Sequence, residues 1–132
     1  MRGGLHLGSI WLCDSEGLSV QNVLLLEQLA MVLRQVRGPW VLVGDWNVTP
    51  ELLTSAHWPE MVGGVVFAPK APTCHASTYD FFVASSGLAP AIAGVKRIDD
   101  GGLGPHWPSR LFLHSRARRP VTRQLILSLI HI

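Results

Sequence analysis

Residues 38–53, GPWVLVGDWNVTPELL, decide how this chain folds. A glycine and a proline are followed by an uninterrupted apolar run, WVLVG at 40–44, which is typical of a short strand buried on both faces. The strand leads directly into a carboxylate and a carboxamide, Asp45 and Asn47. Because side chains two residues apart along a strand point the same way, we expect both groups to face one cleft beyond the sheet.

The preceding sequence supplies the rest of a strand–helix–strand unit. Residues 5–13 predict a strand, and residues 20–37 predict a helix that Ser19 caps. Together with the strand at 40–44, they indicate a crossover between two parallel strands of one sheet. Apolar residues recur along the helix at helical spacing. The expected buried stripe is Leu25, Leu29, Val32, Leu33 and Val36, widened by Val23, Leu26 and Ala30.

Thr49 and Pro50 begin a second helix, because a hydroxyl cap is followed by proline at the first helical position. We expect that helix to end near residues 58–59. Runs rich in aromatic, β-branched and other apolar residues then predict further strands, over residues 63–69, 78–88, 91–99 and 110–115. A loop rich in glycine and proline, DGGLGPHWPS at 100–109, separates the last two strands.

The composition suits one domain or part of one, since 48% of the 132 residues are apolar and 15% are charged. The charges are unevenly distributed. Residues 1–100 carry six basic and nine acidic side chains, a net of −3, whereas residues 101–132 carry five arginines and no acid. A basic end on a mildly acidic body is compatible with a polyanionic partner, and equally with a solvated tail.

Cys13 and Cys74 stand in no metal-ligand spacing, which indicates free thiols in a reducing compartment. No apolar run reaches the roughly 20 residues that span a bilayer, and the first residues contain no segment of signal-peptide length. We therefore expect an intracellular chain with no membrane partner. The last residues, LSLIHI at 127–132, match the reading frame of a common sequencing adapter. They are predicted to be a non-native tail, the alternative being a genuine apolar strand end.

Four polar side chains could act on a phosphate ester. An aspartate such as Asp45 can orient or deprotonate water, and an amide such as that of Asn47 can donate to a phosphate oxygen. Asp45 could instead cap the local backbone. His106 could donate to a phosphate or be an ordinary loop residue. Asp80 lies in an apolar strand, where a carboxylate needs a partner such as histidine unless it faces water at a sheet edge.

In chain order, Gly-Asp-Trp-Asn at 44–47, Asp-Phe-Phe at 80–82 and Gly-Pro-His-Trp-Pro at 104–108 resemble motifs of the endonuclease/exonuclease/phosphatase superfamily. That superfamily includes abasic-site endonucleases, DNase I-like nucleases and the endonuclease domains of non-LTR retroelements. The resemblance covers roughly residues 5–115. It implies an α+β fold: half of a four-layer α/β/β/α sandwich, with one mostly buried mixed sheet and flanking helices. Residues 1–126 would form the carboxyl-terminal half of that domain.

By this resemblance, Asp45 would position or activate the attacking water, and Asn47 would contact the scissile phosphate of a phosphodiester. His106 would stabilise the phosphate in the transition state, and Asp80 would hold His106. Magnesium (Mg²⁺ or Mn²⁺) would offset the developing charge. The partner would be nucleic acid or another phosphoester substrate. Nucleic-acid contacts at the basic end would come from Arg110, Arg116, Arg118 and Arg119.

Three departures from the family pattern leave the metal ligands open, with Asp45 as the candidate. Pro105 stands where the family has an aspartate that contributes to the metal site. The family's main metal-binding glutamate lies upstream of the strand matching residues 5–13, and only four residues precede that strand here. Trp11 stands where many members have a tyrosine or histidine that reaches the phosphate. Its indole can donate one hydrogen bond but cannot exchange a proton.

Three hypotheses follow. The chain is a metal-dependent, endonuclease-like phosphodiesterase, impaired by loss of the upstream half. Alternatively it is a catalytically inactive fragment, or a basic module that binds nucleic acid. A retroelement origin would suit the basic end and would place the protein in the nucleus. Half of a sandwich would also leave one sheet face uncovered, which predicts an apolar patch and possible self-association.

Overall fold

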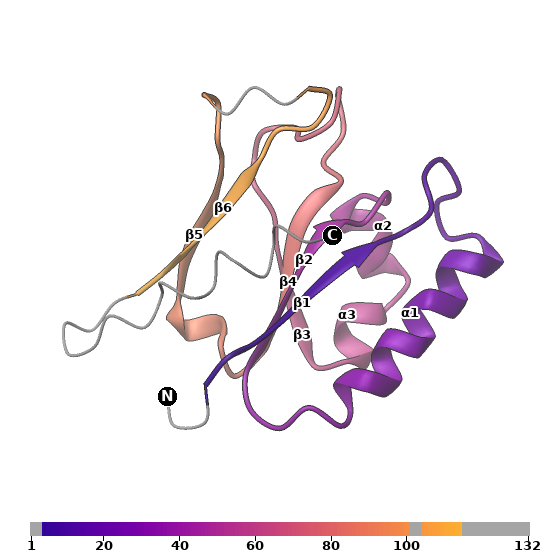
Figure 1. Ribbon diagram of the computed structural model, residues 1–132, viewed down its shortest axis with the longest axis vertical. Helices are drawn as coiled ribbons and strands as arrows, with labels where there is room; N and C mark the ends of the chain where they lie inside the picture. The colour runs from indigo at the N-terminus through magenta and orange to yellow at the C-terminus, as the bar shows by residue number, and fades with distance from the viewer. Residues whose placement is uncertain (1–3, 101–103, 115–132) are drawn as a thin grey trace.

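A mixed four-stranded sheet forms the centre of the computed structural model, which describes residues 4–100 and 104–114 (Figure 1). Its spatial order is β1-β2-β4-β3. β1 and β2 run parallel, and β4 pairs antiparallel with both β2 and β3. The strands are β1 (His6–Trp11), β2 (Trp40–Asp45), β3 (Gly64–Phe67) and β4 (Asp80–Ser85). The parallel pair confirms the predicted crossover.

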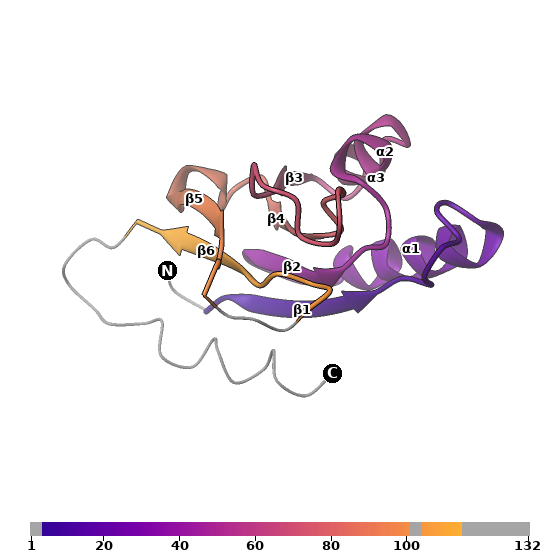
Figure 2. The same cartoon turned by 90° about the horizontal axis from the view of Figure 1, so that it is seen from above.

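Helices cover one face of this sheet, and a two-stranded sheet lies on the other (Figure 2). The helices are α1 (Val20–Leu33), α2 (Pro50–Ser55) and α3 (Trp58–Met61). The second sheet pairs β5 (Ile92–Arg97) with β6 (Ser109–Leu113), after a single 3-10 turn at Ala89–Ala91. The arrangement is a partial α+β sandwich, as expected. The separate β5–β6 sheet differs from the single sheet that the resemblance implied.

Two apolar cores lie on the two faces of the sheet. On the helix side, Trp46 stacks on Phe81 with ring centroids 5.1 Å apart and meets Trp58 edge-on at 5.7 Å. These two indoles are satisfied, because Trp46 donates to the Phe81 carbonyl and Trp58 to that of Leu26. On the opposite face, the buried residues are Val41, Phe82, Ala84 and Leu88. Strand alternation explains the division, since successive side chains point to opposite faces.

Helix caps fall where the sequence predicts them. The Ser19 hydroxyl accepts from the Asn22 N–H at 3.2 Å, and that of Thr49 accepts from the Leu52 N–H at 3.2 Å. The ends differ from expectation. α1 ends at Leu33 rather than near residue 37, and α2 ends at Ser55 because His57 adopts a left-handed conformation that starts a separate helix.

The predicted buried stripe of α1 is rotated from its expected position. Its buried residues are Asn22, Leu26, Ala30 and Leu33, whereas Leu25 and Val32 are exposed. Asn22 accounts for the difference. Its side chain accepts from Cys13 N–H and donates to the carbonyls of Cys13 and Gly17, so a polar residue is drawn inward to hold the β1–α1 loop. Apolar side chains consequently remain on the outer face of α1.

The sheet face opposite the helices is covered in part. Val95 of β5 and Leu111 of β6 pack against the Val41 and Phe82 cluster there. The expectation of a wholly uncovered face is therefore wrong for the described residues, because the β5–β6 sheet folds back over it. Self-association through this face stays a prediction.

Some predictions concern residues outside the described ranges. They are the domain boundary at 126, the tail at 127–132, and the arginines at 116, 118 and 119. Within residues 4–100 and 104–114, no helix has both the length and the apolarity that crossing a membrane requires.

Candidate functional site

Two aspartates end up side by side because two strands meet at one end of the sheet. Asp45 is the last residue of β2 and Asp80 is the first of β4, and they are direct partners in the antiparallel register. Both side chains lie on the face away from the helices, since Val43 and Phe82, two residues away, belong to the core on that face. β4 is an interior strand. The alternative that Asp80 is an edge-strand acid is therefore wrong.

Gly44 allows β2 to approach β1 closely just before Asp45. Its φ is +154°, and a Cβ at this position would lie 1.9 Å from the Ile10 carbonyl oxygen. Any side chain would push the two strands apart. The glycine of the Gly-Asp-Trp-Asn stretch therefore serves the backbone geometry that presents Asp45.

The loop carrying His106 is fastened to the segment before β4. Cys74 and His106 form an isolated antiparallel bridge, and Trp107 N–H donates to the Thr73 carbonyl at 2.6 Å. The guanidinium of Arg97 lies over the Trp107 ring, 5.0 Å from its centroid. Arg97 also donates to the Pro72 carbonyl. These contacts hold the imidazole against the end of the sheet.

Asp80, His106 and Asp45 form a chain of three polar side chains. His106 Nδ1 lies 2.8 Å from Asp80 Oδ2, and Nε2 lies 3.5 Å from Asp45 Oδ2. All three are partly buried, with side-chain exposures of 23% for Asp80, 39% for His106 and 22% for Asp45. The sequence-predicted partnership of Asp80 with His106 is thus present in the geometry.

The electrostatics follow from this arrangement. The hydrogen bond to Asp80 raises the pKa of His106 above its ordinary value, while burial lowers it to a smaller extent. Burial raises the pKa of Asp45, and the hydrogen bond from Asn47 N–H opposes that rise. His106 is therefore disposed to carry a proton, and Asp45 is a better proton acceptor than an exposed aspartate.

Asn47 lies at the site but does not point with Asp45 as expected. The strand ends at Asp45, and Asn47 has φ +49°, so strand alternation no longer applies. Its amide nitrogen donates to the Leu12 carbonyl at 2.7 Å, and its backbone N–H donates to Asp45 Oδ1 at 3.0 Å. Asp45 thus caps the local backbone as well as facing His106. The backbone-capping alternative drawn from the sequence is therefore present, and the role of Asp45 in activating water stays a prediction.

Asp45, Asp80 and His106 can each offer a metal ligand, and those three ligand atoms lie within 4.8 Å of one another. Both nitrogens of His106 already face carboxylates. A hard cation such as Mg²⁺ prefers oxygen. The donor set therefore fits a divalent cation held through Asp45 with water and substrate oxygens, better than one enclosed by all three residues.

Sequence reasoning missed three residues that surround this cluster. The Thr73 hydroxyl, fully buried, accepts from the N–H groups of Tyr79 and Asp80 and so fixes the start of β4. Cys74 is buried beside His106, and its pKa is raised by burial, which keeps the thiol neutral. Asp14, in the turn after β1, adds negative charge that acts on Asp45 and His106. No motif or spacing signals these positions, which lie in turns.

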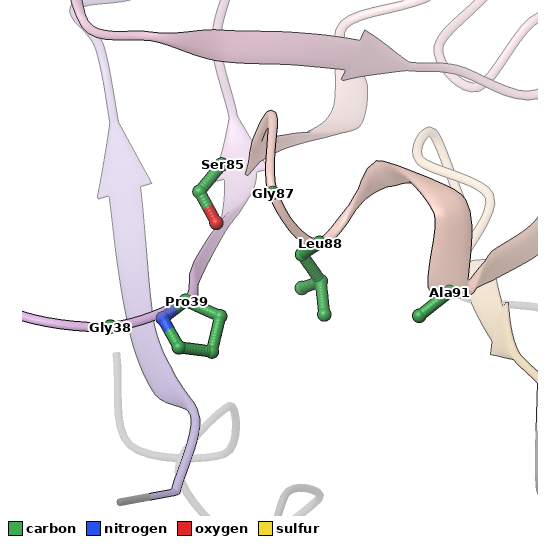
Figure 3. Close-up of a pocket in the computed structure, with 6 residues that line it drawn as sticks. All are labelled: Gly38, Pro39, Ser85, Gly87, Leu88 and Ala91. Atoms are coloured by element: carbon green, nitrogen blue, oxygen red, sulfur yellow. The ribbon is translucent and has the colours of Figure 1, made fainter. Parts of the chain in front are cut away.

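Arg110 is exposed on β6 and takes no part in the cluster. A shallow apolar hollow of about 450 Å³ lies at the opposite end of the sheet (Figure 3). It is lined by Pro39 before β2, by Ser85 at the end of β4 and by Leu88 after it. Because β2 runs from Trp40 to Asp45, this hollow is remote from the polar cluster.

Comparison with solved structures identifies the fold. The crystal structure of cytolethal distending toxin from Actinobacillus actinomycetemcomitans matches 86% of this chain, with TM-score 0.65 and 20% identity. The Haemophilus ducreyi toxin matches 86% with TM-score 0.67 and 17% identity, and CdtB, the biologically active subunit of this toxin, matches 85% with TM-score 0.63 and 17% identity. The chain has a partial DNase I-like fold.

The likeness extends over part of those proteins only. The chain covers 51%, 50% and 49% of the three matched chains, so it spans about half the length of the DNase I-like structures that it resembles. No sequence-family model matches the chain, and no curated protein matches it by sequence. At these identities the DNase I-like comparison concerns the fold alone.

Proposed function

We propose that this chain carries the phosphate-binding part of a metal-dependent, endonuclease-like phosphodiesterase. The observation that supports it is the Asp80–His106–Asp45 chain, with separations of 2.8 Å and 3.5 Å, at the end of a DNase I-like sheet. A protonated imidazole between two carboxylates can bind a phosphate oxygen without losing its orientation. The substrate would be a nucleic acid or another phosphodiester.

Each residue has a role that its contacts favour. Asp80 holds the Nδ1 proton of His106 and leaves Nε2 to donate to a non-bridging phosphate oxygen. Asp45 orients a water molecule and accepts its proton, helped by a raised pKa. The Asn47 amide donates one of its two N–H groups to the Leu12 carbonyl and would offer the other to the scissile phosphate. The backbone N–H of Asn47 meanwhile keeps Asp45 in place.

Mg²⁺ or Mn²⁺ would be held through Asp45 and would supply positive charge against the charge that develops on the phosphate. Pro105 offers no carboxylate beside His106. A low metal affinity is therefore part of the proposal, and activity would need millimolar rather than micromolar metal.

The direct test is cleavage of a fluorescent single-stranded oligonucleotide and of supercoiled plasmid by the purified chain, with Mg²⁺ or Mn²⁺ titrated. Asp45→Asn and His106→Gln should each lower the rate by about 100-fold or more. Glu60→Gln is the matched control, because this exposed acid on α3 pairs with His57 and lies outside the cluster. Pro105→Asp should lower the metal concentration required.

The test also decides between active and inactive forms of the fold. Cleavage that is unaffected by Asp45→Asn would come from a contaminant and would defeat the proposal. A chain that is inert at every metal concentration, as wild type and as Pro105→Asp, would be the catalytically inactive fragment. A retroelement origin and an intracellular or nuclear location stay predictions, since the fold comparison concerns toxins.

A basic nucleic-acid-binding module is the second candidate, and one observation favours it. Lys96 of β5 and Arg110 of β6 are direct cross-strand partners, and both are exposed. Like charges directly opposite each other destabilise a sheet unless an anion lies between them. Lys96→Glu with Arg110→Glu should weaken oligonucleotide binding and reduce its salt dependence. Retention that does not change with salt would exclude this module.

A further inference from the structure

Trp11 is an exposed aromatic residue in line with the polar cluster. It is 69% exposed, whereas Trp40, Trp46 and Trp58 are all buried. An indole that stays in water forgoes the burial that the other three gain. An exposed tryptophan indicates a binding role when a functional group lies beside it.

The register places Trp11 next to Asp45. The last pair between β1 and β2 is Trp11 with Asp45, and the last pair between β2 and β4 is Asp45 with Asp80. Laterally paired residues in a sheet point to the same face. The three side chains thus form one row across neighbouring strands, about 4.8 Å apart at the backbone.

The core composition confirms the face on which Trp11 lies. Leu12, the next residue, is buried in the helix-side core, and Leu7, four residues earlier than Trp11, packs on the opposite face. Trp11 therefore projects from the same face as Asp45. β1 is the edge strand of the sheet, so no further strand within the described chain lies beyond Trp11.

The backbone at this point is held firmly. Leu12 N–H donates to the Asp45 carbonyl at 3.0 Å, and the Leu12 carbonyl accepts from the Asn47 amide at 2.7 Å. Trp11 is thus fixed on its backbone relative to Asp45, while its ring stays open to solvent. An exposed aromatic ring beside a phosphate-binding group is the arrangement that single-stranded nucleic-acid sites use for stacking.

We propose that Trp11 stacks on the base next to the scissile phosphate, so that the substrate of this site is unpaired nucleic acid rather than a lipid or sugar phosphoester. The inference rests on the proposed function for the position of the phosphate. A phosphate bound at His106 Nε2, beside Asp45, would leave the adjoining nucleoside one strand spacing away, above β1. Stacking requires a base but does not depend on the nucleotide sequence, because every base offers a flat face.

The experiment compares two labelled 8-mers with equal numbers of phosphates, (dT)₈ and an abasic tetrahydrofuran 8-mer, by fluorescence anisotropy in Ca²⁺ and low salt. Wild type should bind (dT)₈ about 5- to 150-fold more tightly than the abasic strand. Trp11→Ala should remove this preference without changing affinity for the abasic strand, and Trp11→Phe should keep most of it. Met31→Ala, an exposed apolar residue on α1, is the matched control and should keep the preference.

Indole fluorescence gives a second readout, since a stacked base quenches it. Unlabelled (dT)₈ should quench the fluorescence of wild type more than that of Trp11→Phe, although both bind.

An equal preference for (dT)₈ over the abasic strand in wild type and Trp11→Ala, or no binding of either strand, would overturn the stacking role. Hydrolysis of the abasic strand in Mn²⁺ tests the proposed function separately. If wild type prefers (dT)₈ but hydrolyses nothing, the stacking role of Trp11 is supported and the proposed function fails. If the chain hydrolyses the abasic strand but Trp11→Ala keeps the preference for (dT)₈, the stacking role alone fails.

Discussion

His106 Nδ1 lies 2.8 Å from Asp80 Oδ2, joining the loop before β6 to the first residue of β4 across 26 positions of sequence. This contact sets the tautomer of the imidazole and turns Nε2 toward Asp45, 3.5 Å away. When protonated, His106 can donate from both ring nitrogens. The proposed phosphate chemistry depends on this contact between Asp80 and His106.

Asp80→Asn should lower the pKa of His106, because the carboxylate that stabilises the imidazolium is replaced by a neutral amide. Phosphodiesterase activity should fall by about 100-fold or more, since the imidazole loses both charge and orientation. NMR titration of the His106 ring protons, assigned with His106→Gln, measures the pKa. Asp99→Asn is the control, because Asp99 pairs with Arg97 rather than with His106. An unchanged His106 titration in Asp80→Asn would contradict this account.

The stabilising effect of the Asp80–His106 pair should depend on pH. The pKa of His106 is raised in the folded protein, so the pair stabilises the fold fully below the ordinary histidine pKa of 6.5 and loses this effect as pH rises through the raised value. The difference in unfolding free energy between wild type and His106→Gln should therefore be largest near pH 5 and smallest near pH 9. Urea denaturation at several pH values measures it. In an Asp80→Asn background the same substitution should give a flatter profile, and an equally steep profile there would rule out Asp80 as the cause.

Asp45→Asn should stabilise the protein at neutral pH while reducing its activity. Burial raises the pKa of Asp45 in the folded state, so its ionised form opposes folding. This cost is absent below the ordinary value of 3.8 and is fully present above the raised pKa. The variant should unfold at a higher temperature than wild type at pH 7, with the gap closing as pH falls toward 4. A lower melting temperature at pH 7 would show that the carboxylate contributes net stability.

Gly44→Ala should destabilise the fold by more than about 2 kcal/mol, because the new Cβ would meet the Ile10 carbonyl oxygen at 1.9 Å. Neither backbone can move without breaking the β1–β2 pairing. Gly87→Ala is the matched control, since a Cβ there meets nothing within 4 Å. Chemical denaturation of both variants measures the difference. Equal stability of the two variants would mean that β1 and β2 can separate at Gly44 without cost.

Local rules were sufficient to predict where the first two helices and the central strand of this chain begin. The apolar run at 40–44 and the caps at Ser19 and Thr49 act within a few residues and appear in the structure as predicted, whereas the ends of the first two helices do not. The position of the Asp45 carboxylate was also predicted from the sequence, since a charged residue directly after a buried strand has to lie where the strand ends and the sheet opens to solvent.

Tertiary structure alone decided which groups meet. The β2–β4 register set Asp45 beside Asp80, and the β1–β2 register set Trp11 beside Asp45. The turn at Asn47 redirected its amide to Leu12, against the alternation of an ideal strand. Asn22 rotated α1 and left apolar residues outside. Strand register and side-chain hydrogen bonds join residues distant along the chain, so no periodicity in the sequence encodes them.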